Sequence, residues 1–276
     1  MTPGSGKHGR VLIVAGSDSG GGAGIQADIK TVTALGGYAA TAITALTAQD
    51  TRDVHAIAEV DPAFIAKQIA VVLADIGADC IKTGMLHRAE VIEIVAATLT
   101  DHAAGVPLVV DPVMVAKGGA ALLDPATAGL LKERLIPMAT LLTPNIPESI
   151  ELVGGPIESV ADMQAAARRL AALGPEAVLV KGGHRPGSGI VDVLLYRDEI
   201  VEFTGPRIET RHTHGTGCTT ASAIAAYLAQ GRGLIDAVTA ARHYVREAIR
   251  TAPGFGAGHG PLNHAHTIGS HARSDD

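Results

Sequence analysis

Tryptophan is absent from this 276-residue sequence, and aromatic residues of all kinds make up only 3% of it. Hydrophobic residues nevertheless account for 47%, so the core has to be built from alanine, valine, leucine and isoleucine. A core of this kind suits helices layered on parallel strands. The chain also lacks any linker, internal repeat or charge block, and its length lies at the upper end of the single-domain range. We therefore predict one domain over residues 1–276, with loose termini at residues 1–9 and about 262–276.

Excess positive charge is absent as well. The formal net charge is −6 at pH 7, and no stripe of lysine and arginine occurs. Nucleic acid and anionic membrane surfaces are therefore poor candidate partners. A small anion can still bind, because backbone N–H groups at a helix start need no net positive charge. These observations favour a small-molecule substrate.

Cysteine is scarce, and long apolar runs are missing. Cys80 and Cys218 lie in unrelated sequence contexts, which favours two reduced thiols over a metal cluster. Polar residues interrupt every apolar stretch well short of the ~18 residues of a membrane span. The first apolar run, Val11–Ala15, is too short for the core of a signal peptide. We expect a cytoplasmic protein.

Short runs rich in β-branched residues alternate with longer stretches of helical period. The expected strands are Val11–Ala15, Ala39–Leu46, Ala78–Thr83, Leu108–Asp111, Leu141–Thr143 and Ala177–Lys181, with a hairpin over Ile190–Tyr196 and Ile200–Phe203. The expected helices are Ile25–Leu35, Pro62–Ala74, Arg88–Asp101, Ala126–Leu135, Ser159–Leu173, Thr216–Gln230 and Leu234–Thr251. This order predicts an α/β fold of three layers, with a mainly parallel central sheet, helices on both faces and an antiparallel edge. In such folds ligands bind beyond the carboxyl ends of the strands.

A glycine-rich loop follows the first expected strand. Within it Gly22–Ala27 matches a dinucleotide-binding fingerprint, which leaves a dinucleotide-dependent oxidoreductase as one alternative. The loop is too long for that motif, however, and Asp28 in the first helical turn would repel a pyrophosphate. We predict a site for a neutral polar ligand, in which Asp28 accepts a hydrogen bond from an amine. The alternative is a flexible loop without a binding role, in which the helix dipole stabilises the negative charge of Asp28 near the helix N-terminus.

Polar side chains also follow the next strands. The amide of Gln49 carries a donor and an acceptor in one plane, so it can pair with a ring nitrogen and a neighbouring amino group; it can equally be a turn residue. Met85 can form the wall of an apolar slot or simply pack in the core. Asp111 directly after a strand can lie near a divalent cation or a transferring phosphate. Lys117, beside two glycines, suits a mobile phosphate-facing loop.

Two further strand ends carry residues that suit phosphate and metal. Asn145 and Glu148, three residues apart, can offer one neutral and one anionic oxygen to a partly hydrated Mg²⁺; alternatively, Glu148 is only a first-turn acid of a helix. Lys181 suits a nucleotide phosphate, with a solvated loop lysine as the alternative. Asp192 lies shortly beyond it.

The run HTHGTGC carries the most specific pattern. Gly215 and Gly217 bracket Thr216, so that consecutive N–H groups can point into one concavity at the start of a helix and form an anion hole. Cys218 then lies in the first helical turn, where the helix start is expected to lower its pKa below about 8.5. A thiolate there can take the proton of an alcohol as phosphorus is attacked. The alternative is a small residue that packs the helix on the sheet.

These segments together resemble the ribokinase-like superfamily and, more narrowly, the hydroxymethylpyrimidine/phosphomethylpyrimidine kinases of thiamine biosynthesis. The resemblance rests on AGSDSGGGAGIQADIKT, ALTAQDT, KTGML, VVDPVMVAKGG, LLTPNIPE, VKGGH and HTHGTGCT. It implies ATP-dependent phosphorylation of 4-amino-5-hydroxymethyl-2-methylpyrimidine to its monophosphate and then to the diphosphate, with Mg²⁺, in a homodimer. Gly118 departs from the serine expected at that position. A pyridoxine or pyridoxal kinase of the same cysteine-bearing lineage is the main alternative, and a regulator that has lost catalysis is a third.

The resemblance also implies roles for individual residues. The aminopyrimidine would be held by Gly16, Asp28, Gln49 and Met85, with Thr47 and Val113 lining its site. The Mg²⁺–phosphate region would contain Asp111, Asn145 and Glu148, with Lys181, Lys117, Asp192 and Thr213–Gly217 on the ATP side. Cys218 would be the catalytic residue, at a position where sugar kinases and many pyridoxal kinases carry aspartate.

Overall fold

The computed structural model describes residues 8–114, 125–185, 187 and 189–268. Within these residues one sheet has the strand order β3-β2-β1-β4-β5-β6-β7-β8-β9. The strands are β1 (Arg10–Asp18), β2 (Tyr38–Gln49), β3 (Val54–Glu59), β4 (Cys80–Thr83), β5 (Leu108–Val110), β6 (Leu141–Leu142), β7 (Ala177–Val180), β8 (Gly189–Tyr196) and β9 (Glu199–Pro206). The helices are α1 (Gly24–Ala34), α2 (Pro62–Asp75), α3 (Ala89–His102), α4 (Pro125–Leu130), α5 (Ile146–Val153), α6 (Val160–Ala171), α7 (Thr216–Ala229) and α8 (Leu234–Arg250). No helix in this part of the chain is long and apolar enough to cross a membrane.

The sheet is parallel in its centre and antiparallel at both edges. Strands β2, β1, β4, β5, β6 and β7 pair in parallel, and β8 and β9 form the predicted antiparallel hairpin. The turn between them is tighter than expected, because Arg197 and Asp198 alone connect the strands and both have positive φ. The sequence did not predict β3, which pairs antiparallel with β2. Its residues are exposed or only partly buried, so no buried run marks it in the sequence.

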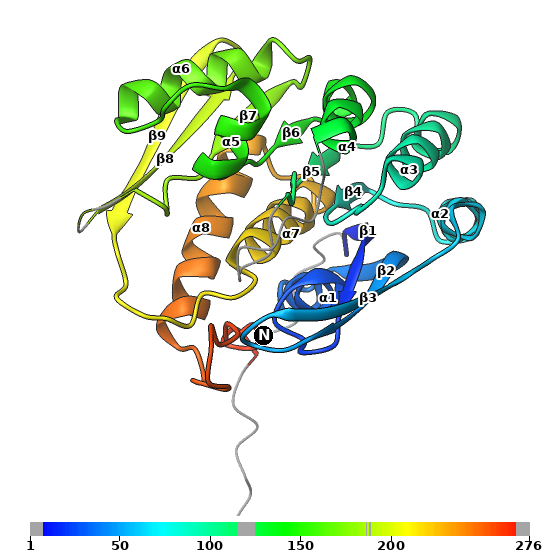
Figure 1. Cartoon of the computed structure of the whole chain (residues 1–276), viewed down its shortest axis with the longest axis horizontal. Helices are drawn as coiled ribbons and strands as arrows, with labels where there is room; N and C mark the ends of the chain where they lie inside the picture. Colours follow the sequence, from blue (N-terminus) through cyan, green and yellow to red (C-terminus); the bar gives the residue numbers. More distant parts are fainter. Residues whose placement is uncertain (1–7, 115–124, 186, 188, 269–276) are drawn as a thin grey trace, which may run out of the picture.

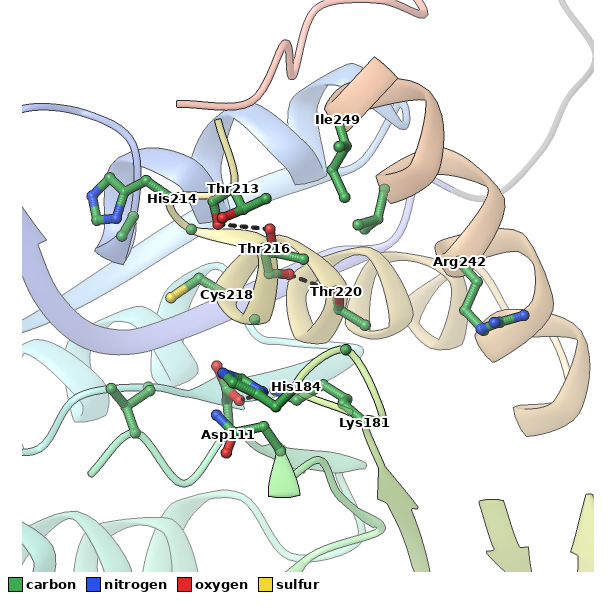
Figure 2. Close-up of a pocket in the computed structure, with 18 of the residues that line it drawn as sticks. Asp111, Lys181, His184, Thr213, His214, Thr216, Cys218, Thr220, Arg242 and Ile249 are labelled. Atoms are coloured by element: carbon green, nitrogen blue, oxygen red, sulfur yellow. Dashed lines mark hydrogen bonds and ion pairs between the residues drawn. The ribbon is translucent and has the colours of Figure 1, made fainter. Parts of the chain in front are cut away.

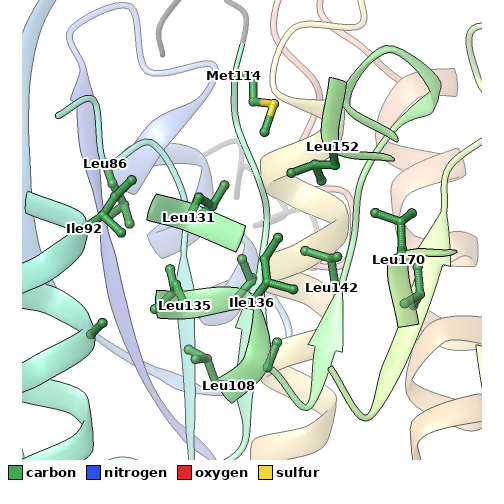
Figure 3. Packing of buried hydrophobic residues seen from close by; sticks show 14 of the residues in the cluster. Leu86, Ile92, Leu108, Met114, Leu131, Leu135, Ile136, Leu142, Leu152 and Leu170 are labelled. Carbon is green, nitrogen blue, oxygen red and sulfur yellow. The ribbon is translucent and has the colours of Figure 1, made fainter. Parts of the chain in front are cut away.

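Helices cover both faces of the sheet, which confirms the three-layer prediction (Figure 1). One buried cluster joins the sheet to α1, α7 and α8. The other joins it to the helices from α2 to α6, and Figure 3 shows part of this core, including Leu108, Leu135 and Leu142. Both clusters consist mainly of aliphatic side chains, as the composition requires.

Several helix boundaries follow from local chemistry that the sequence displays. Asp61 caps α2 by accepting a hydrogen bond from the backbone N–H of Phe64, and Ser159 caps α6 in a box with Asp162. The helix expected over Ala126–Leu135 is not uniform. It continues beyond α4 as a wider π-helical turn, Leu131–Leu135.

The C-terminal segment is ordered further than predicted. Leu262 and His264 are only 4% and 5% exposed, so a loose terminus starting at about residue 262 is wrong. The hydroxyl of Tyr244 donates to the backbone oxygen of His264 at 2.7 Å. Burial lowers the pKa of His264 to about 4, and its ring contacts Thr219 in α7 at 3.0 Å. This segment is therefore packed against α7 and α8.

Candidate active site

A cavity of about 880 Å³ opens at the carboxyl ends of the parallel strands. It collects residues from the ends of β1, β2, β4, β5, β6 and β7 and from the start of α7. Figure 2 shows the start of α7 with Asp111 and Lys181 opposite it. The predicted site residues that line it are Gly16, Thr47, Gln49, Met85, Asp111, Val113, Asn145, Glu148, Lys181, Asp192, Thr213, Gly215, Thr216, Gly217 and Cys218. Lys117 lies outside the described residues.

Asp28 is the exception, and its predicted contact with a substrate amine is contradicted by its burial. Its side chain is fully buried, and both carboxylate oxygens have partners inside the protein. Lys82 donates to one at 2.8 Å, and Ser222 donates to the other at 2.6 Å. Burial opposes the charge on Lys82, but its anionic neighbours, Asp28 above all, outweigh it and raise the Lys82 pKa. The Asp28–Lys82 pair is thus a buried support beneath the cavity.

Removing one member of this pair should cost stability. Lys82→Met leaves Asp28 buried without its cation, and we expect a loss of about 3–5 kcal/mol in the free energy of unfolding. The double variant Asp28→Asn/Lys82→Met should recover most of this loss, because no unpaired charge remains. Urea unfolding of both variants measures the difference. Equal destabilisation of the single and the double variant would contradict the assigned role.

The glycine-rich loop is organised around Asp18, a residue that the sequence did not single out. Its carboxylate accepts hydrogen bonds from the backbone N–H groups of Gly20, Gly22 and Ala23, at 2.8, 3.0 and 2.8 Å. The amides that would bind a pyrophosphate are therefore already occupied by an internal anion. This arrangement argues against the dinucleotide alternative. The only hint in the sequence was an acidic residue two positions before a run of glycines.

The acceptor side of the cavity combines an apolar wall with an amide. Gly16 lies against Met85 so closely that a Cβ atom on Gly16 would come within 2.6 Å of the Met85 methyl carbon. Gln49 and Thr47 lie beside them at the end of β2. Gly16, Thr47, Gln49 and Met85 thus share one wall of the cavity, which we call the slot, and Asp28 is not part of it. The binding of a ring there stays a prediction.

The start of α7 forms the opposite side. Gly215 precedes the first helical residue, Thr216, and has a φ of +79°. A Cβ atom on Gly215 would lie 1.8 Å from the backbone oxygen of Gly22, so this turn requires glycine. Thr216 donates its hydroxyl proton to the backbone oxygen of Thr213 at 2.7 Å. The helix start therefore has the predicted position and faces the cavity (Figure 2).

Lys181 and Asp111 form an ion pair opposite this helix start. Lys181 Nζ lies 3.0 Å from Asp111 Oδ1, and their side chains are 14% and 2% exposed. The position of a Cβ on Gly217 is 3.3 Å from Lys181 Nζ and 3.7 Å from Asp111 Oδ2. The absence of a side chain at Gly217 thus leaves a small space between the helix start and this pair.

The donor set fits a metal ion that arrives with phosphate rather than one held by protein alone. No group of three or more His, Cys, Asp or Glu side chains that could hold a metal occurs among the described residues. Asp111 uses Oδ1 for Lys181 and Thr143, while Oδ2 faces the space beside Gly217. One carboxylate oxygen completed by phosphate oxygens and water is a usual Mg²⁺ environment.

Asn145 and Glu148 have a structural role as well as a place in the cavity wall. They form a capping box at the start of α5: the side chain of Asn145 accepts from the Glu148 N–H at 2.9 Å, and the side chain of Glu148 accepts from the Asn145 N–H at 2.7 Å. Burial raises the pKa of Glu148 to about 7, opposed by Lys181 and reinforced by Asp111. Glu148 is therefore a first-turn acid of α5, and its contact with Mg²⁺ stays a prediction.

Asp192 holds other groups in place. One of its oxygens accepts from the Gly182 N–H at 2.8 Å, and the other accepts from Arg242 Nε at 2.7 Å. The direct phosphate contact predicted for Asp192 gains no support from this geometry. Arg242, on α8, lines the cavity and was missed, because nothing in its helical sequence distinguishes it from a surface arginine.

The thiol of Cys218 is not the low-pKa group that its place at a helix start predicted. Burial raises its pKa to about 11; Lys82 opposes this increase, while Asp28 and Asp111 add to it. The prediction of a resting thiolate is therefore wrong. Burial and the nearby carboxylates raise the pKa of the thiol by more than the helix start lowers it.

This pKa gives the alcohol reaction a defined pH dependence if Cys218 is its base. The reactive form is the thiolate, so below a pKa of about 11 its fraction grows with pH. We expect kcat/KM for an alcohol acceptor to rise by about tenfold per pH unit between pH 7 and 9. Initial rates across this range measure the slope. Cys218→Ala should remove it, and a flat profile for the unmodified protein would contradict the base role.

Solved structures similar to this chain include small-molecule kinases. The pyridoxal kinase of Bacillus subtilis in its ADP complex superposes with a TM-score of 0.86 at 35% identity, covering 94% of this chain and 98% of that one. The phosphomethylpyrimidine kinase of Clostridium difficile gives a TM-score of 0.78 at 41% identity, with 87% and 99% covered. The chain is therefore a kinase of ribokinase-like fold.

Sequence comparisons assign the chain to a narrower family within this fold. The family model described as phosphomethylpyrimidine kinase matches residues 18–263, and the chain belongs to this family. The thiamine biosynthesis bifunctional protein ThiED of Geobacter sulfurreducens is 55% identical over 93% of this chain. The chain spans about half of that longer relative, 52%. The hydroxymethylpyrimidine/phosphomethylpyrimidine kinase of Bacillus subtilis is 45% identical, with 92% of this chain and 94% of the relative covered.

Proposed function

We propose that this protein transfers phosphate from ATP first to the hydroxymethyl group of 4-amino-5-hydroxymethyl-2-methylpyrimidine and then to the resulting monophosphate. One observation carries the proposal: a single cavity joins an amide-and-methionine slot to a helix start that faces a lysine–aspartate pair. The slot suits a flat ring with polar edges, and the helix start suits a transferring phosphate. Family membership supports the same reaction.

The ring would lie against Gly16 and Met85, with its polar edge at Gln49. Thr47 and Val113 would complete this side of the cavity. Binding of a neutral ring requires no charged side chain, which agrees with the burial of Asp28 in the core.

The phosphates of ATP would meet the start of α7 at Gly215 and Gly217 and the ammonium group of Lys181. The N–H groups of Thr213, His214 and Thr216 already donate to backbone oxygens. Mg²⁺ brought by ATP would be held by Asp111 Oδ2 with help from Glu148, and it would neutralise charge on the transferring phosphoryl group. The preorganised N–H groups at the start of α7 would stabilise the charge that develops during transfer. Asp192 would support this side indirectly, through Gly182 and Arg242.

Cys218 would act only in the first transfer. An alcohol has to lose its proton when it attacks phosphorus, whereas a phosphate monoester already carries an ionised oxygen. The assembly in solution would be a homodimer, and the compartment would be the cytoplasm.

Pyridoxal phosphorylation is the second candidate, because the pyridoxal kinase of Bacillus subtilis superposes closely on this chain. Incubation with ATP-Mg²⁺ and either the pyrimidine alcohol, its monophosphate or pyridoxal, followed by anion-exchange chromatography, distinguishes the two. We expect a diphosphate from both pyrimidine acceptors. Turnover of pyridoxal alone would replace the proposed function.

A further inference from the structure

His214 connects three parts of the cavity wall that the proposed reaction treats separately. It lies in the loop that leads into α7 and is only 6% exposed. Its ring nitrogen Nε2 is 3.0 Å from Asp18 Oδ2 in the glycine-rich loop. The same nitrogen is 3.3 Å from Nε2 of Gln49 at the end of β2. The loop that leads into α7, the glycine-rich loop and the slot therefore meet at the imidazole ring of His214.

Asp18 determines which role this nitrogen plays. Burial favours the neutral acid, but hydrogen bonds from His214, Ala23 and Gly20 outweigh it and keep the pKa of Asp18 below its usual value. The carboxylate can therefore only accept hydrogen bonds. A nitrogen in contact with it has to carry a proton, whether the ring is neutral or charged. Nε2 of His214 is thus a donor.

A donor at this position determines the orientation of the Gln49 amide. The oxygen and nitrogen of a carboxamide have nearly the same shape, so their hydrogen-bond partners decide which is which. With the amide nitrogen toward His214, two donors face each other. Rotation of the amide by half a turn places its oxygen toward His214 and removes this conflict. The single Nε2 proton, which Asp18 accepts at 3.0 Å, is then shared in a three-centre hydrogen bond with the amide oxygen at about the 3.3 Å position.

Thr47 permits this rotation. Its hydroxyl lies 3.1 Å from the other end of the Gln49 amide and 2.9 Å from the backbone oxygen of Ser17. The single hydroxyl proton can go to Ser17, which leaves a lone pair for the amide nitrogen. Thr47 therefore accepts either orientation of the amide, and His214 decides between them.

We propose that His214 is a positioning residue that determines acceptor specificity, because its N–H donor fixes the rotation of the Gln49 amide. Each end of that amide uses one partner and keeps one position free, a lone pair on the His214 side and an N–H on the Thr47 side. An aminopyrimidine offers an amino donor beside a ring-nitrogen acceptor, which matches this order. The 4-oxo analogue offers a carbonyl acceptor beside a ring N–H, which is the reverse. This inference rests on the proposed pyrimidine acceptor.

The test compares two acceptors on the same variant. We would measure kcat/KM for the 4-amino alcohol and for its 4-oxo analogue with ATP-Mg²⁺ in the unmodified protein, His214→Leu and His214→Gln. The ratio of the two constants should fall by at least about tenfold in His214→Leu, because the amide is free to rotate toward either ring. His214→Gln keeps an N–H at this position and should retain most of the ratio. A general loss of activity does not change this ratio, because both constants are measured on the same variant.

Two further measurements make the outcome decisive. His212→Leu, in the same loop but outside the cavity wall, should leave the ratio unchanged. ¹⁵N NMR of labelled histidine should show a protonated Nε2 at His214. An unchanged ratio in His214→Leu, or an unprotonated Nε2, would overturn the inference. If the unmodified protein phosphorylates neither pyrimidine, the proposed function fails instead, and the NMR result still decides whether His214 is the donor.

Discussion

Cys218→Ala is expected to slow phosphorylation of the alcohol by about 10²–10⁴-fold, the usual contribution of a positioned general base. The monophosphate step should change by less than about tenfold, because its acceptor oxygen is already ionised. Cys218 lines the cavity in the first turn of α7. The two steps can be measured separately, with the alcohol or the monophosphate as the starting acceptor.

The control for this variant is Cys80→Ala. Cys80 is fully buried in β4 and does not line the cavity, so its replacement should leave the ratio of the two rates unchanged. Equal losses in both steps for Cys218→Ala would show that the thiol contributes to packing or to phosphate binding. The base role would then be abandoned.

Gly217→Ala is expected to reduce both steps together, by about 10²–10³-fold, the usual effect of disturbing an oxyanion-type site. The new methyl group would occupy the space between the start of α7, Lys181 Nζ and Asp111 Oδ2, at 3.3 and 3.7 Å from these atoms. It meets no backbone atom among its nearest neighbours, so folding should be retained. Steady-state rates and a thermal unfolding curve together separate the two effects.

A matched glycine exists away from the cavity. A methyl group on Gly129, in α4, would have no neighbour within 4 Å among the described residues, and Gly129→Ala should therefore leave both rates unchanged. If Gly217→Ala is as active as Gly129→Ala, the space beside Lys181 is not where phosphate is transferred. A selective loss in the alcohol step alone would also contradict this assignment.

Much of the site could be predicted because its residues follow strands. Asp111 and Lys181 each follow a short, fully buried strand that contains valine, and Gln49 is the last residue of β2. Parallel strands bring such ends to one edge of the sheet. The sequence therefore predicted the fold class and the strand-end part of the cavity wall, but not the part that residues 204–210 and α8 contribute.

The errors concern properties that depend on distant parts of the chain. The sequence predicts Asp28 as an ordinary acid of the first helical turn, but α1 starts at Gly24 and Asp28 lies beyond that turn. Only the structure shows that Lys82 and Ser222 enclose it. The pKa of Cys218 depends on burial together with charges from α1, β4 and the end of β5. Arg242 reaches the cavity from α8, because Asp192 holds its guanidinium group. Periodicity and spacing describe neighbours along the chain and carry no information on such contacts.

The internal anion of the glycine-rich loop has a consequence for the order of events. Because Asp18 already occupies the amides of Gly20, Gly22 and Ala23, this loop offers little attraction to a phosphorylated acceptor. The start of α7 and Lys181, on the opposite side of the cavity, attract the phosphate group instead. A monophosphate should therefore enter with its ring in the same place as the alcohol and its charged end toward the donor. Both transfers then share one direction of approach, and the pyrimidine has no need to turn over between them.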